Sequence, residues 1–445
     1  MSAYARNEIP SRCEVLVIGG GPAGSSAATH LAKAGIDVVL FEAARFPRNQ
    51  VGESLIPHIW KFADGLGVSH KIREEGFVQK AGGLTVWNGK IRQIGFKRYG
   101  FDRPGMHVER DLFDDLLLRH AEASGARVFT EVSVAKANFS DADRPVLHYI
   151  DKRDGESTNA SIGCLYVVDA SGHRSFLAGQ FGSRQTVDSS LQFLSIWGYF
   201  QNSRYVGEDL NSHSMDELRK AKPVTFVLSH EDGWLWHIVL REKTSVGLVI
   251  HTDKTRGMKS PEREKYFLET CGRLAYLRDL LECAEYIPGS VCYRPDYSYY
   301  STTICGDNFY CIGDAGAFVD PIFSHGVQNA FFNAQAASLA IRESFKKKET
   351  RRRYSELCKS RMQQFYGFSR AMSLGDFGIN GVDTGLVKSM MKTLSARELA
   401  LVIDAASMTN RSEHILRLVE ETGIRRNFEE AFDLRDQRTI HALDL

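Results

Sequence analysis

The chain has 445 residues, of which 43% are hydrophobic and 25% are charged, an ordinary composition for a soluble globular protein. Its formal net charge of +1 gives no support to bulk binding of nucleic acid. No run of 18 apolar residues occurs, so no transmembrane helix is expected, and the polar first twelve residues lack a signal-peptide core. The length favours two or three domains, or one large α/β enzyme with an inserted subdomain.

The cysteines predict neither a metal site nor a disulfide framework. Eight of them are scattered along the chain, without a C-x-x-C pair or a zinc-type spacing. We therefore expect no bound metal, reduced thiols and a cytoplasmic protein.

A glycine-rich turn near the start of the chain is the strongest local signal. The apolar segment Val15–Ile18 is typical of a buried parallel strand, and a helix is expected over Ser25–Lys33. Between them, Gly19, Gly21 and Gly24 have the spacing G-x-G-x-x-G. The first glycine allows the tight turn, the second lets the backbone approach a pyrophosphate, and the third lets helix and strand pack closely. The N–H groups at the start of the helix would then face the phosphates.

An acidic residue follows at the position expected for a dinucleotide-binding fold. A second strand is predicted over Asp37–Phe41, and it ends at Glu42, 18 residues after Gly24. A carboxylate there holds a ribose hydroxyl. We predict a dinucleotide site that includes Pro22 and Ala23 of the loop, in preference to an ordinary glycine turn.

Three charged residues further along are ambiguous from residue type alone. Glu53 lies in a loop before a helix predicted over His58–Glu75, and either is solvated or faces the cofactor. Lys80 stands before a Gly-Gly turn, where it is either a surface residue or one that reaches into a cavity. Arg110, at a strand-to-helix junction, either binds a phosphate or carboxylate or pairs with a neighbouring acid.

Two later segments repeat the pattern of a strand followed by a small-residue turn. They are Cys164–Gly172 and Asn308–Gly316, and Asp314 in the second is placed to accept hydrogen bonds from sugar-like hydroxyls. Paired strands are expected over Ala126–His148. Three strand-to-turn segments spread over about 300 residues indicate one cofactor fold interrupted by insertions.

The insertion and the tail differ in character. Alternation over Thr225–Ile250 predicts antiparallel strands in an aromatic-rich insert, which either walls a cavity or fills its own core. No proline follows Pro321, so we expect a helical tail with breaks near 375–385. The basic run Lys346–Arg353 is typical of a solvated helix end or loop; docking of an acidic partner is the minority interpretation.

Four stretches resemble one enzyme family, the FAD-dependent monooxygenase superfamily with the p-hydroxybenzoate hydroxylase fold, and within it the flavin-dependent halogenases. They are Phe46–Arg48 with Val51–Pro57, Phe77–Trp87, Trp234–Val239, and Phe318–Gly326. The chain looks most similar to the chloramphenicol-pathway halogenase and to halogenases of carrier-bound pyrrole or phenolic substrates. The resemblance covers about residues 10 to 345.

The resemblance implies an α/β fold with three parts: a Rossmann-type FAD-binding domain, an inserted antiparallel β-sheet substrate domain and a helical C-terminal region. The expected boundaries are 1–182 and 302–345 for the two parts of the FAD-binding domain, 183–301 for the insert and 346–445 for the helical region.

The implied activity is halogenation by reduced FAD. The family forms a flavin hydroperoxide with oxygen, and chloride or bromide then yields hypohalous acid, which a lysine directs at an electron-rich aromatic ring. The substrate would be a phenol or pyrrole, free or tethered to an acyl or peptidyl carrier protein, in antibiotic or other natural-product biosynthesis. Because the chain has one dinucleotide fingerprint, a separate flavin reductase is expected. A hydroxylase or reductase of the same fold is the alternative, and a non-catalytic flavoprotein is a third.

The resemblance also implies roles for individual residues. Lys80 would be the catalytic lysine, and Glu53 would lie near it, polarising it or accepting the ring proton. FAD contacts are expected from Arg48, Arg110, Asp314, Gly326 and Val327. A halide site is expected at Ser324, His325 and Gly326, and substrate-side or tunnel positions at Trp234, Trp236, Pro321 and Phe323.

Two positions depart from the common family pattern or vary within it. Val239 replaces the proline of the W-x-W-x-I-P motif, whose tryptophans are thought to keep flavin away from substrate; both tryptophans are present, so the halogenase prediction is kept. Asp296 aligns with an aspartate that can bond covalently to FAD, although a noncovalent contact is favoured because most relatives bind FAD that way.

Overall fold

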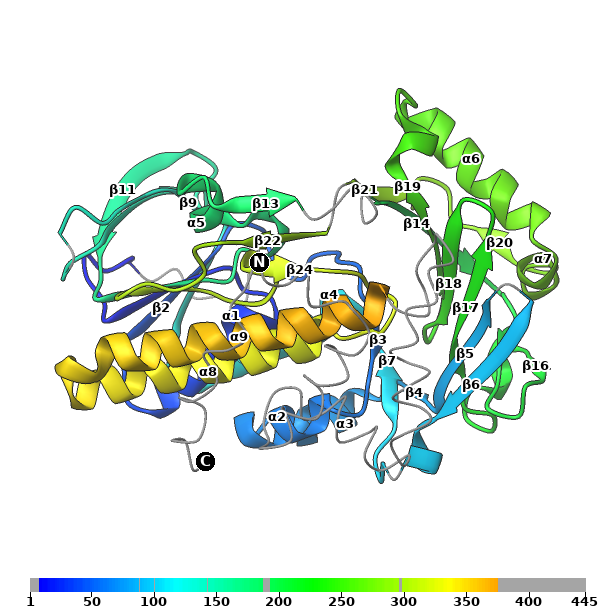
Figure 1. The fold of residues 1–445 in the computed structure, drawn as a ribbon, viewed down its shortest axis with the longest axis horizontal. Coiled ribbons are helices and arrows are strands. Elements are labelled where there is room, and N and C mark those ends of the chain that lie inside the picture. The colour runs from blue at the N-terminus through cyan, green and yellow to red at the C-terminus, as the bar shows by residue number, and fades with distance from the viewer. Residues whose placement is uncertain are drawn as a thin grey trace.

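The computed structural model describes residues 8–87, 89–99, 101–141, 143–186, 193–295 and 298–374. Asp296 and the tail from 375 to 445, for which helices and breaks are predicted, lie outside the described residues. The described chain forms two halves, a helix-covered parallel sheet and a large mainly antiparallel sheet (Figure 1).

The first half is built on a five-stranded parallel sheet. Its strands, in spatial order, are β23 (Phe309–Cys311), β12 (Tyr166–Asp169), β1 (Val15–Ile18), β2 (Val38–Glu42) and β8 (Arg127–Thr130). Every residue of β1, β2 and β12 is buried, as expected for apolar parallel strands that are covered on both faces. The three predicted strand-to-turn segments are therefore neighbours in one sheet, and their turns lie at its carboxyl edge.

Helices cover this sheet. They are α1 (Pro22–Lys33), α4 (Arg110–Ala123), α8 (Gly326–Lys346) and α9 (Arg351–Leu374), with the short α5 (Phe176–Gln180) near the second turn. Helix α8 packs against both α1 and α9, and the two long helices run side by side in Figure 1. The described part of the proline-free tail is thus helical, as predicted.

Two small sheets flank the parallel one. They consist of β9 (Val132–Asn138), β10 (Val146–Asp151) and β11 (Thr158–Gly163), and of β13 (Arg184–Thr186), β22 (Tyr299–Ser301) and β24 (Ala317–Phe318). The strand pair predicted over Ala126–His148 corresponds to β8, β9 and the start of β10, although β8 belongs to the parallel sheet.

The second half is the large sheet. Its strands, in spatial order, are β20 (Glu285–Tyr286), β14 (Phe193–Gln201), β19 (Thr244–His251), β18 (Gly233–Val239), β17 (Val224–His230), β5 (Gly82–Trp87) and β6 (Lys90–Gly95), with β21 (Cys292–Pro295) on β14. The β5–β6 hairpin lies outside the predicted insert in the sequence, but it belongs to this sheet because β5 pairs in parallel with β17. The sheet therefore extends beyond residues 183–301.

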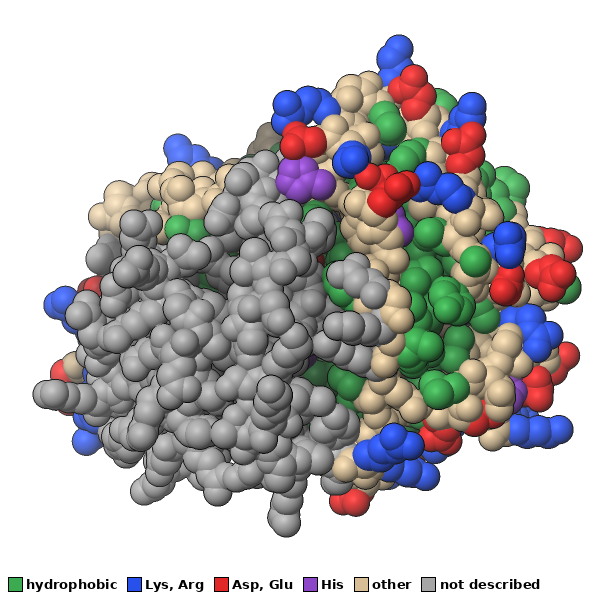
Figure 2. Space-filling model, turned by 45° about the vertical axis from the view of Figure 1, so that its right-hand side comes forward, with side chains coloured by type: hydrophobic (Ala, Val, Ile, Leu, Met, Phe, Trp, Pro, Cys, Tyr) green, Lys and Arg blue, Asp and Glu red, His purple; other side chains and the backbone are tan. Residues whose placement is uncertain are grey.

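The two faces of this sheet have different roles. Helices α6 (Ser260–Arg273) and α7 (Ala275–Leu280) pack on one face, against side chains such as Leu235. The alternate residues Trp234 and Trp236 lie on the opposite face, because successive side chains of a strand point to opposite sides. In the same half of the molecule, Figure 2 shows hydrophobic side chains gathered at the surface and bordered by charged ones.

A three-stranded antiparallel sheet joins the two halves. It has the order β3 (Ser54–Leu55), β7 (Gly105–His107) and β4 (Val78–Lys80). Next to it, the continuous helix predicted over 58–75 is wrong: the segment forms α2 (Ile59–Leu66) and α3 (Ser69–Glu75). Gly67 between them adopts a left-handed φ of 75°, which ends α2, and its N–H donates to the carbonyl of Asp64.

The basic run lies at the turn between α8 and α9, as predicted for a helix end or loop. Asp143 pairs with Lys348 at 3.1 Å and with Arg351 at 3.4 Å, so part of the positive charge of the basic run is already neutralised within the chain.

All eight cysteines belong to the described residues and are free. Among the helices that the structure describes, none is long and apolar enough to cross a membrane. A remaining two-stranded ribbon pairs β15 (Tyr205–Val206) with β16 (Ser212–His213).

Candidate functional site

The glycine loop has the close packing that its spacing predicts. A Cβ on Gly19 would lie 2.4 Å from the carbonyl oxygen of Ala170, and a Cβ on Gly24 would lie 1.9 Å from that of Gly19. Gly19 also has a φ of 103°. A Cβ on Gly21 would meet, among the described residues beyond its chain neighbours, an Arg48 guanidinium nitrogen at 3.2 Å and no other atom within 4 Å. The outer glycines therefore serve the backbone, whereas Gly21 leaves room for a ligand.

The acidic residue at the end of β2 holds this loop in place. Glu42 is buried, and its carboxylate accepts hydrogen bonds from the backbone N–H of Gly20 and of Ala44, each at 2.7 Å. It also lines the cavity described below, together with Pro22 and Ala23. The ribose contact predicted for Glu42 would therefore come from a carboxylate that is already fixed by two donors.

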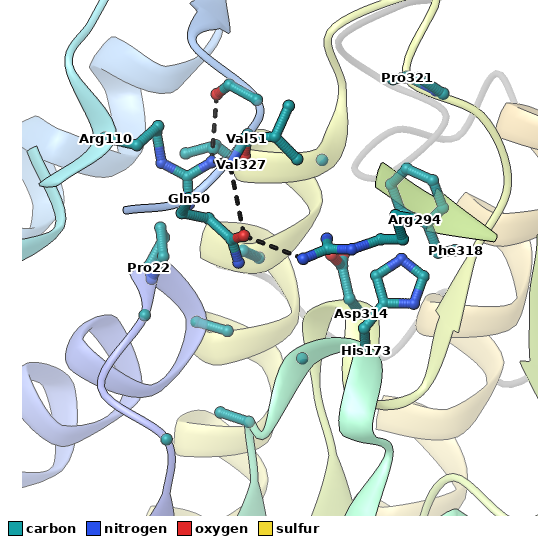
Figure 3. A pocket seen from close by; sticks show the side chains of 18 of the residues that line it. Pro22, Gln50, Val51, Arg110, His173, Arg294, Asp314, Phe318, Pro321 and Val327 are labelled. Carbon is teal, nitrogen blue, oxygen red and sulfur yellow. Dashed lines mark hydrogen bonds between the residues drawn. The ribbon is translucent and has the colours of Figure 1, made fainter. Parts of the chain in front are cut away.

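Two predicted arginines share one buried carboxylate. Asp114 is fully buried in α4 and accepts from Arg48 at 3.0 Å and from Arg110 at 2.9 and 3.1 Å. Arg110 also donates to the carbonyls of Val51 and Gly52, as Figure 3 shows for the first. We name Asp114, Arg48 and Arg110 the arginine clamp. Sequence reasoning missed Asp114, although it follows Arg110 by one helical turn.

A third arginine faces the predicted ribityl contact. Asp314 is half-buried at the cavity wall; desolvation raises the pKa of its carboxyl to about 6, and the charges of Arg294 and Arg110 act in the opposite direction. Arg294 donates to the side-chain oxygen of Gln50 at 3.1 Å, and Figure 3 shows this pair beside Asp314. The site thus brings three arginines, Arg48, Arg110 and Arg294, to one cavity, where their guanidinium groups can bind an anionic group.

A cavity of about 440 Å³ connects these groups with the large sheet. This volume is within the usual range for cofactor and ligand sites. Its walls include the clamp arginines and, from the predicted site residues, Gly19, Gly21, Pro22, Ala23, Glu42, Glu53, Trp234, Trp236, Asp314, Pro321, Ser324, Gly326 and Val327. Phe323, His325 and Lys80 do not line it, whereas Ser54 and Thr225 do.

The predicted halide turn has an unusual backbone. Ser324 has a φ of 57°, a left-handed conformation that is uncommon outside glycine, and its N–H donates to the carbonyl of Pro321 at 3.0 Å. Helix α8 begins at Gly326, so the positive end of a 21-residue helix follows the turn. His325 is buried and stacks on Phe323, and its pKa falls to about 3 through desolvation and the charges of His58 and Lys80.

Lys80 is a buried amine, and no carboxylate of the described residues is among its hydrogen-bond partners. It is 3% exposed, and its Nζ donates to Ser54 Oγ at 2.7 Å and lies 5.5 Å from the ring centre of Phe96. Desolvation lowers its pKa to about 7. Gly105 lies opposite Lys80 in the β4–β7 pair; a Cβ there would lie 3.4 Å from the lysine Cδ, so the glycine leaves room for the lysine stem.

Glu53 has other partners than the predicted lysine. It is 2% exposed; Tyr199 donates to one carboxylate oxygen at 2.7 Å and Ser245 to the other at 3.3 Å. Burial raises the pKa of Glu53, and these two hydrogen bonds and Arg110 partly oppose the shift. Trp236 Nε1 donates to Ser245 Oγ at 3.1 Å, so Glu53 is linked to the tryptophan motif. In the described part of the chain, no hydrogen bond joins Glu53 to Lys80.

The comparisons with known proteins agree on one family. A family model described as an FAD binding domain matches residues 12–367. A tryptophan 2-halogenase of Chondromyces crocatus is 34% identical over 338 residues, covering 75% of this chain and 62% of that protein. The flavin-dependent halogenase armH3 of Armillaria mellea is 33% identical over 356 residues, covering 76% of this chain and 69% of that one. This chain thus spans less than two thirds of the Chondromyces relative.

Solved structures of halogenases share the fold. The myxobacterial chondrochloren halogenase CndH is 26% identical and superposes with a TM-score of 0.76, covering 93% of this chain and 97% of that one. The flavin-dependent halogenase CmlS is 27% identical with a TM-score of 0.71, covering 95% and 78%. The α/β fold with a Rossmann-type domain, antiparallel sheets and C-terminal helices is thereby confirmed.

Proposed function

The chain belongs to the flavin-dependent halogenases of the FAD-binding-domain family, and we propose that it halogenates an electron-rich aromatic ring with reduced FAD, oxygen and chloride or bromide. When bound, reduced FAD and oxygen supply the oxidant that converts halide to hypohalous acid. The remaining tasks belong to the residues of the chain.

The residues present fit FAD. The glycine loop leaves open space at Gly21, and helix α1 begins at Pro22 beside it. The clamp arginines and Arg294 offer donors for the two phosphates, and Asp314 offers an acceptor for a sugar-like hydroxyl. The N–H groups from Gly326 onward, at the start of α8, would stabilise negative charge near the cofactor and the halide. For Asp296 we favour a noncovalent contact.

The observation that carries this proposal is the environment of Lys80. An amine with a pKa of about 7 is partly neutral at physiological pH, whereas an exposed lysine is almost entirely charged. Such an amine either donates a hydrogen bond to hypohalous acid or takes up the halogen itself, and in both cases directs it at one ring carbon. Ser54, its partner, lines the cavity, so the amine lies one hydroxyl group behind the cavity wall.

The halide and the two tryptophans lie between the clamp and Lys80 in this proposal. The turn Ser324–Gly326 would hold the halide through backbone N–H groups. Trp234 and Trp236 would separate the cofactor from the substrate; the hydrogen bond from Trp236 to Ser245 fixes that ring, and Val239 does not remove it. Pro321 and Phe323 would shape the passage. Glu53 would accept the ring proton without contacting the lysine, since its hydrogen bonds within the described residues go to Tyr199 and Ser245.

The substrate class follows from the chemistry and from the relatives. Electrophilic halogen needs an electron-rich ring, and the Chondromyces relative is named for an indole amino acid. We propose a phenol or pyrrole, free or tethered to a carrier protein, in natural-product biosynthesis. We also propose a separate flavin reductase as partner, and a cytoplasmic location for a protein whose eight cysteines are all free.

The test uses the full chain with FAD, a flavin reductase, oxygen and chloride or bromide. Monochlorodimedone reports hypohalous acid, and a panel of phenols and pyrroles reports transfer to a ring. We expect Lys80→Met to keep the first activity and to lose the second by about a hundredfold or more. The exposed Lys265→Met is the matched control and should change neither.

Three results would contradict the proposal. Ring halogenation by Lys80→Met at the wild-type rate would remove the lysine from the mechanism. An oxygenated product without halogen would identify a hydroxylase. A protein that binds FAD but forms neither hypohalous acid nor a halogenated or oxygenated ring, with chloride or with bromide, would be a non-catalytic flavoprotein.

A further inference from the structure

Three buried polar side chains, Ser54, Thr225 and His107, continue the contact of Lys80 in one line, and the half-buried Ser324 branches from it. Ser54 Oγ, which accepts from Lys80, lies 3.0 Å from Thr225 Oγ1. Thr225 Oγ1 lies 2.9 Å from His107 Nε2, and His107 Nδ1 lies 3.0 Å from the carbonyl oxygen of Val239. Ser324 of the predicted halide turn joins the line at Ser54, at 2.9 Å. We name these groups the hydroxyl chain.

The pleat of the three-stranded sheet explains how it forms. Ser54 and Val78 are each directly opposite His107 in the pairs β3–β7 and β4–β7. Side chains of opposite residues share a face of a sheet, and Lys80, two residues after Val78, lies on that same face. The sheet therefore places Ser54, His107 and Lys80 together, and β17 adds Thr225 from the large sheet.

One carbonyl group fixes the direction of every bond in the line. The oxygen of Val239 only accepts, so His107 Nδ1 carries the hydrogen. Burial, together with the charges of Lys80 and His237, lowers the pKa of His107 well below its usual value, although the Val239 carbonyl acts the other way. The ring is thus neutral, and its Nε2 accepts from the hydroxyl of Thr225.

The same logic continues to the lysine. The hydroxyl of Thr225 has one hydrogen, which it donates to His107, so its oxygen accepts a hydrogen bond from Ser54. The hydroxyl of Ser54 therefore donates its hydrogen to Thr225, and its two lone pairs accept hydrogen bonds from Lys80 and from Ser324. Ser54 therefore has no hydrogen left to donate to the nitrogen of Lys80, and a neutral amine keeps its lone pair free.

From this geometry we infer that His107 and Thr225 are positioning residues, which turn the Ser54 hydroxyl away from Lys80 and so keep the lysine lone pair available to electrophilic halogen. The inference rests on the proposed function for its purpose, but the orientation itself is a property of the chain. Neither residue touches the reacting atoms, and both act through Ser54.

The first test measures the lone pair directly and needs no halide. Cyanate carbamylates unprotonated amines, and mass spectrometry of the Lys80 peptide at pH 8 to 9 gives the rate, normalised to the exposed Lys265. In Thr225→Val the Ser54 hydrogen is released and turns to the lysine nitrogen. We expect carbamylation of Lys80 to slow by about five- to tenfold, the equivalent of one hydrogen bond.

Matched variants separate orientation from loss of packing. Thr225→Ser keeps the hydroxyl and should restore the rate. His107→Gln keeps a donor for Val239 and an acceptor for Thr225, and should also restore it. Thr244→Val removes a buried hydroxyl of the same kind from a neighbouring cluster, where it bonds Ser203 at 2.6 Å without touching the line, and should leave the rate unchanged.

Three outcomes would overturn the inference. The first is equal carbamylation in wild type and Thr225→Val. The second is a wild-type Lys80 that cyanate does not label, because a free lone pair reacts. The third is ¹⁵N NMR of labelled histidine that shows the His107 hydrogen on Nε2.

Halogenation assays then connect the orientation to activity. Thr225→Val should lower the ratio of ring halogenation to monochlorodimedone turnover by a similar factor, and Thr225→Ser should behave as wild type. If the wild-type protein halogenates nothing, the proposed function fails, but carbamylation and NMR still decide the orientation. If it halogenates and Thr225→Val transfers halogen as well as wild type, the inference alone fails.

Discussion

Lys80→Met should stabilise the protein, and by an amount that depends on pH. Burial lowers the lysine pKa from 10.5 to about 7, which means that the charged form is disfavoured in the folded state relative to the unfolded one. The unfolded chain therefore binds more protons than the folded chain between these two values, so wild-type stability rises with pH there. Methionine has a similar shape and no charge, and removes this dependence.

The magnitude follows from the two pKa values. The difference between 10.5 and about 7 corresponds to a destabilisation of about 5 kcal/mol when both states are protonated, near pH 6. At pH 10 most of this penalty is gone, and about 1 kcal/mol remains. Lys80→Met should thus exceed wild type in free energy of unfolding by several kcal/mol at pH 6, and by much less at pH 10.

Denaturant unfolding of both proteins at pH 6, 8 and 10 checks this, because titrating groups that do not interact with Lys80 contribute equally and cancel in the difference. Lys265→Met, an exposed lysine whose Nζ lies 3.8 Å from Glu269, should show a small difference that does not vary with pH. A Lys80→Met difference that stays constant over this range would refute the reasoning, since it would mean that the buried amine keeps an ordinary pKa.

Two further predictions concern the cofactor half. Asp114→Asn should weaken FAD binding by about tenfold or more, because the clamp arginines lose the charged partner that orients them. Asp115→Asn is the control and should leave FAD binding unchanged, because Asp115 pairs with the exposed Arg119. Flavin fluorescence titration measures the affinity of both variants. Gly24→Ala should abolish FAD binding or folding, since its Cβ would lie 1.9 Å from the Gly19 carbonyl oxygen, while Gly65→Ala, with open space around it, should raise the melting temperature slightly. An Asp114 variant with wild-type affinity, or a Gly24→Ala protein that binds FAD normally, would contradict the corresponding argument.

The parts of the fold that sequence predicts well are those encoded locally. The strand, turn and helix around Gly19–Gly24 follow from an apolar run, three glycines and an alanine-rich segment within about twenty residues. The broken helix at Gly67 could have been anticipated, because a glycine there favours the left-handed conformation that ends a helix. Asp114 likewise stands one helical turn from Arg110, although the sequence does not reveal that Arg48 reaches it.

The hydroxyl chain could not be read from the sequence. Ser54, His107 and Thr225 come from three separate segments, and none of them is unusual in its local context. They meet because β3, β7 and β17 adopt a particular register, and register depends on pairings between residues far apart in the chain. The β5–β6 hairpin was missed as part of the large sheet for the same reason.

The choice of a hydroxyl partner for Lys80 has a chemical reason. A carboxylate at hydrogen-bond distance would stabilise the ammonium form and raise the pKa, which would leave little neutral amine near pH 7. Glu53 is adjacent to Ser54 in sequence, yet its hydrogen bonds go to Tyr199 and Ser245. Ser54 supplies a neutral acceptor instead, so burial alone sets the lysine pKa. The same burial that keeps part of Lys80 neutral near pH 7 therefore also destabilises the folded protein. The reactive fraction of Lys80 should rise as the pH passes about 7, and the stability should rise from there toward pH 10.5.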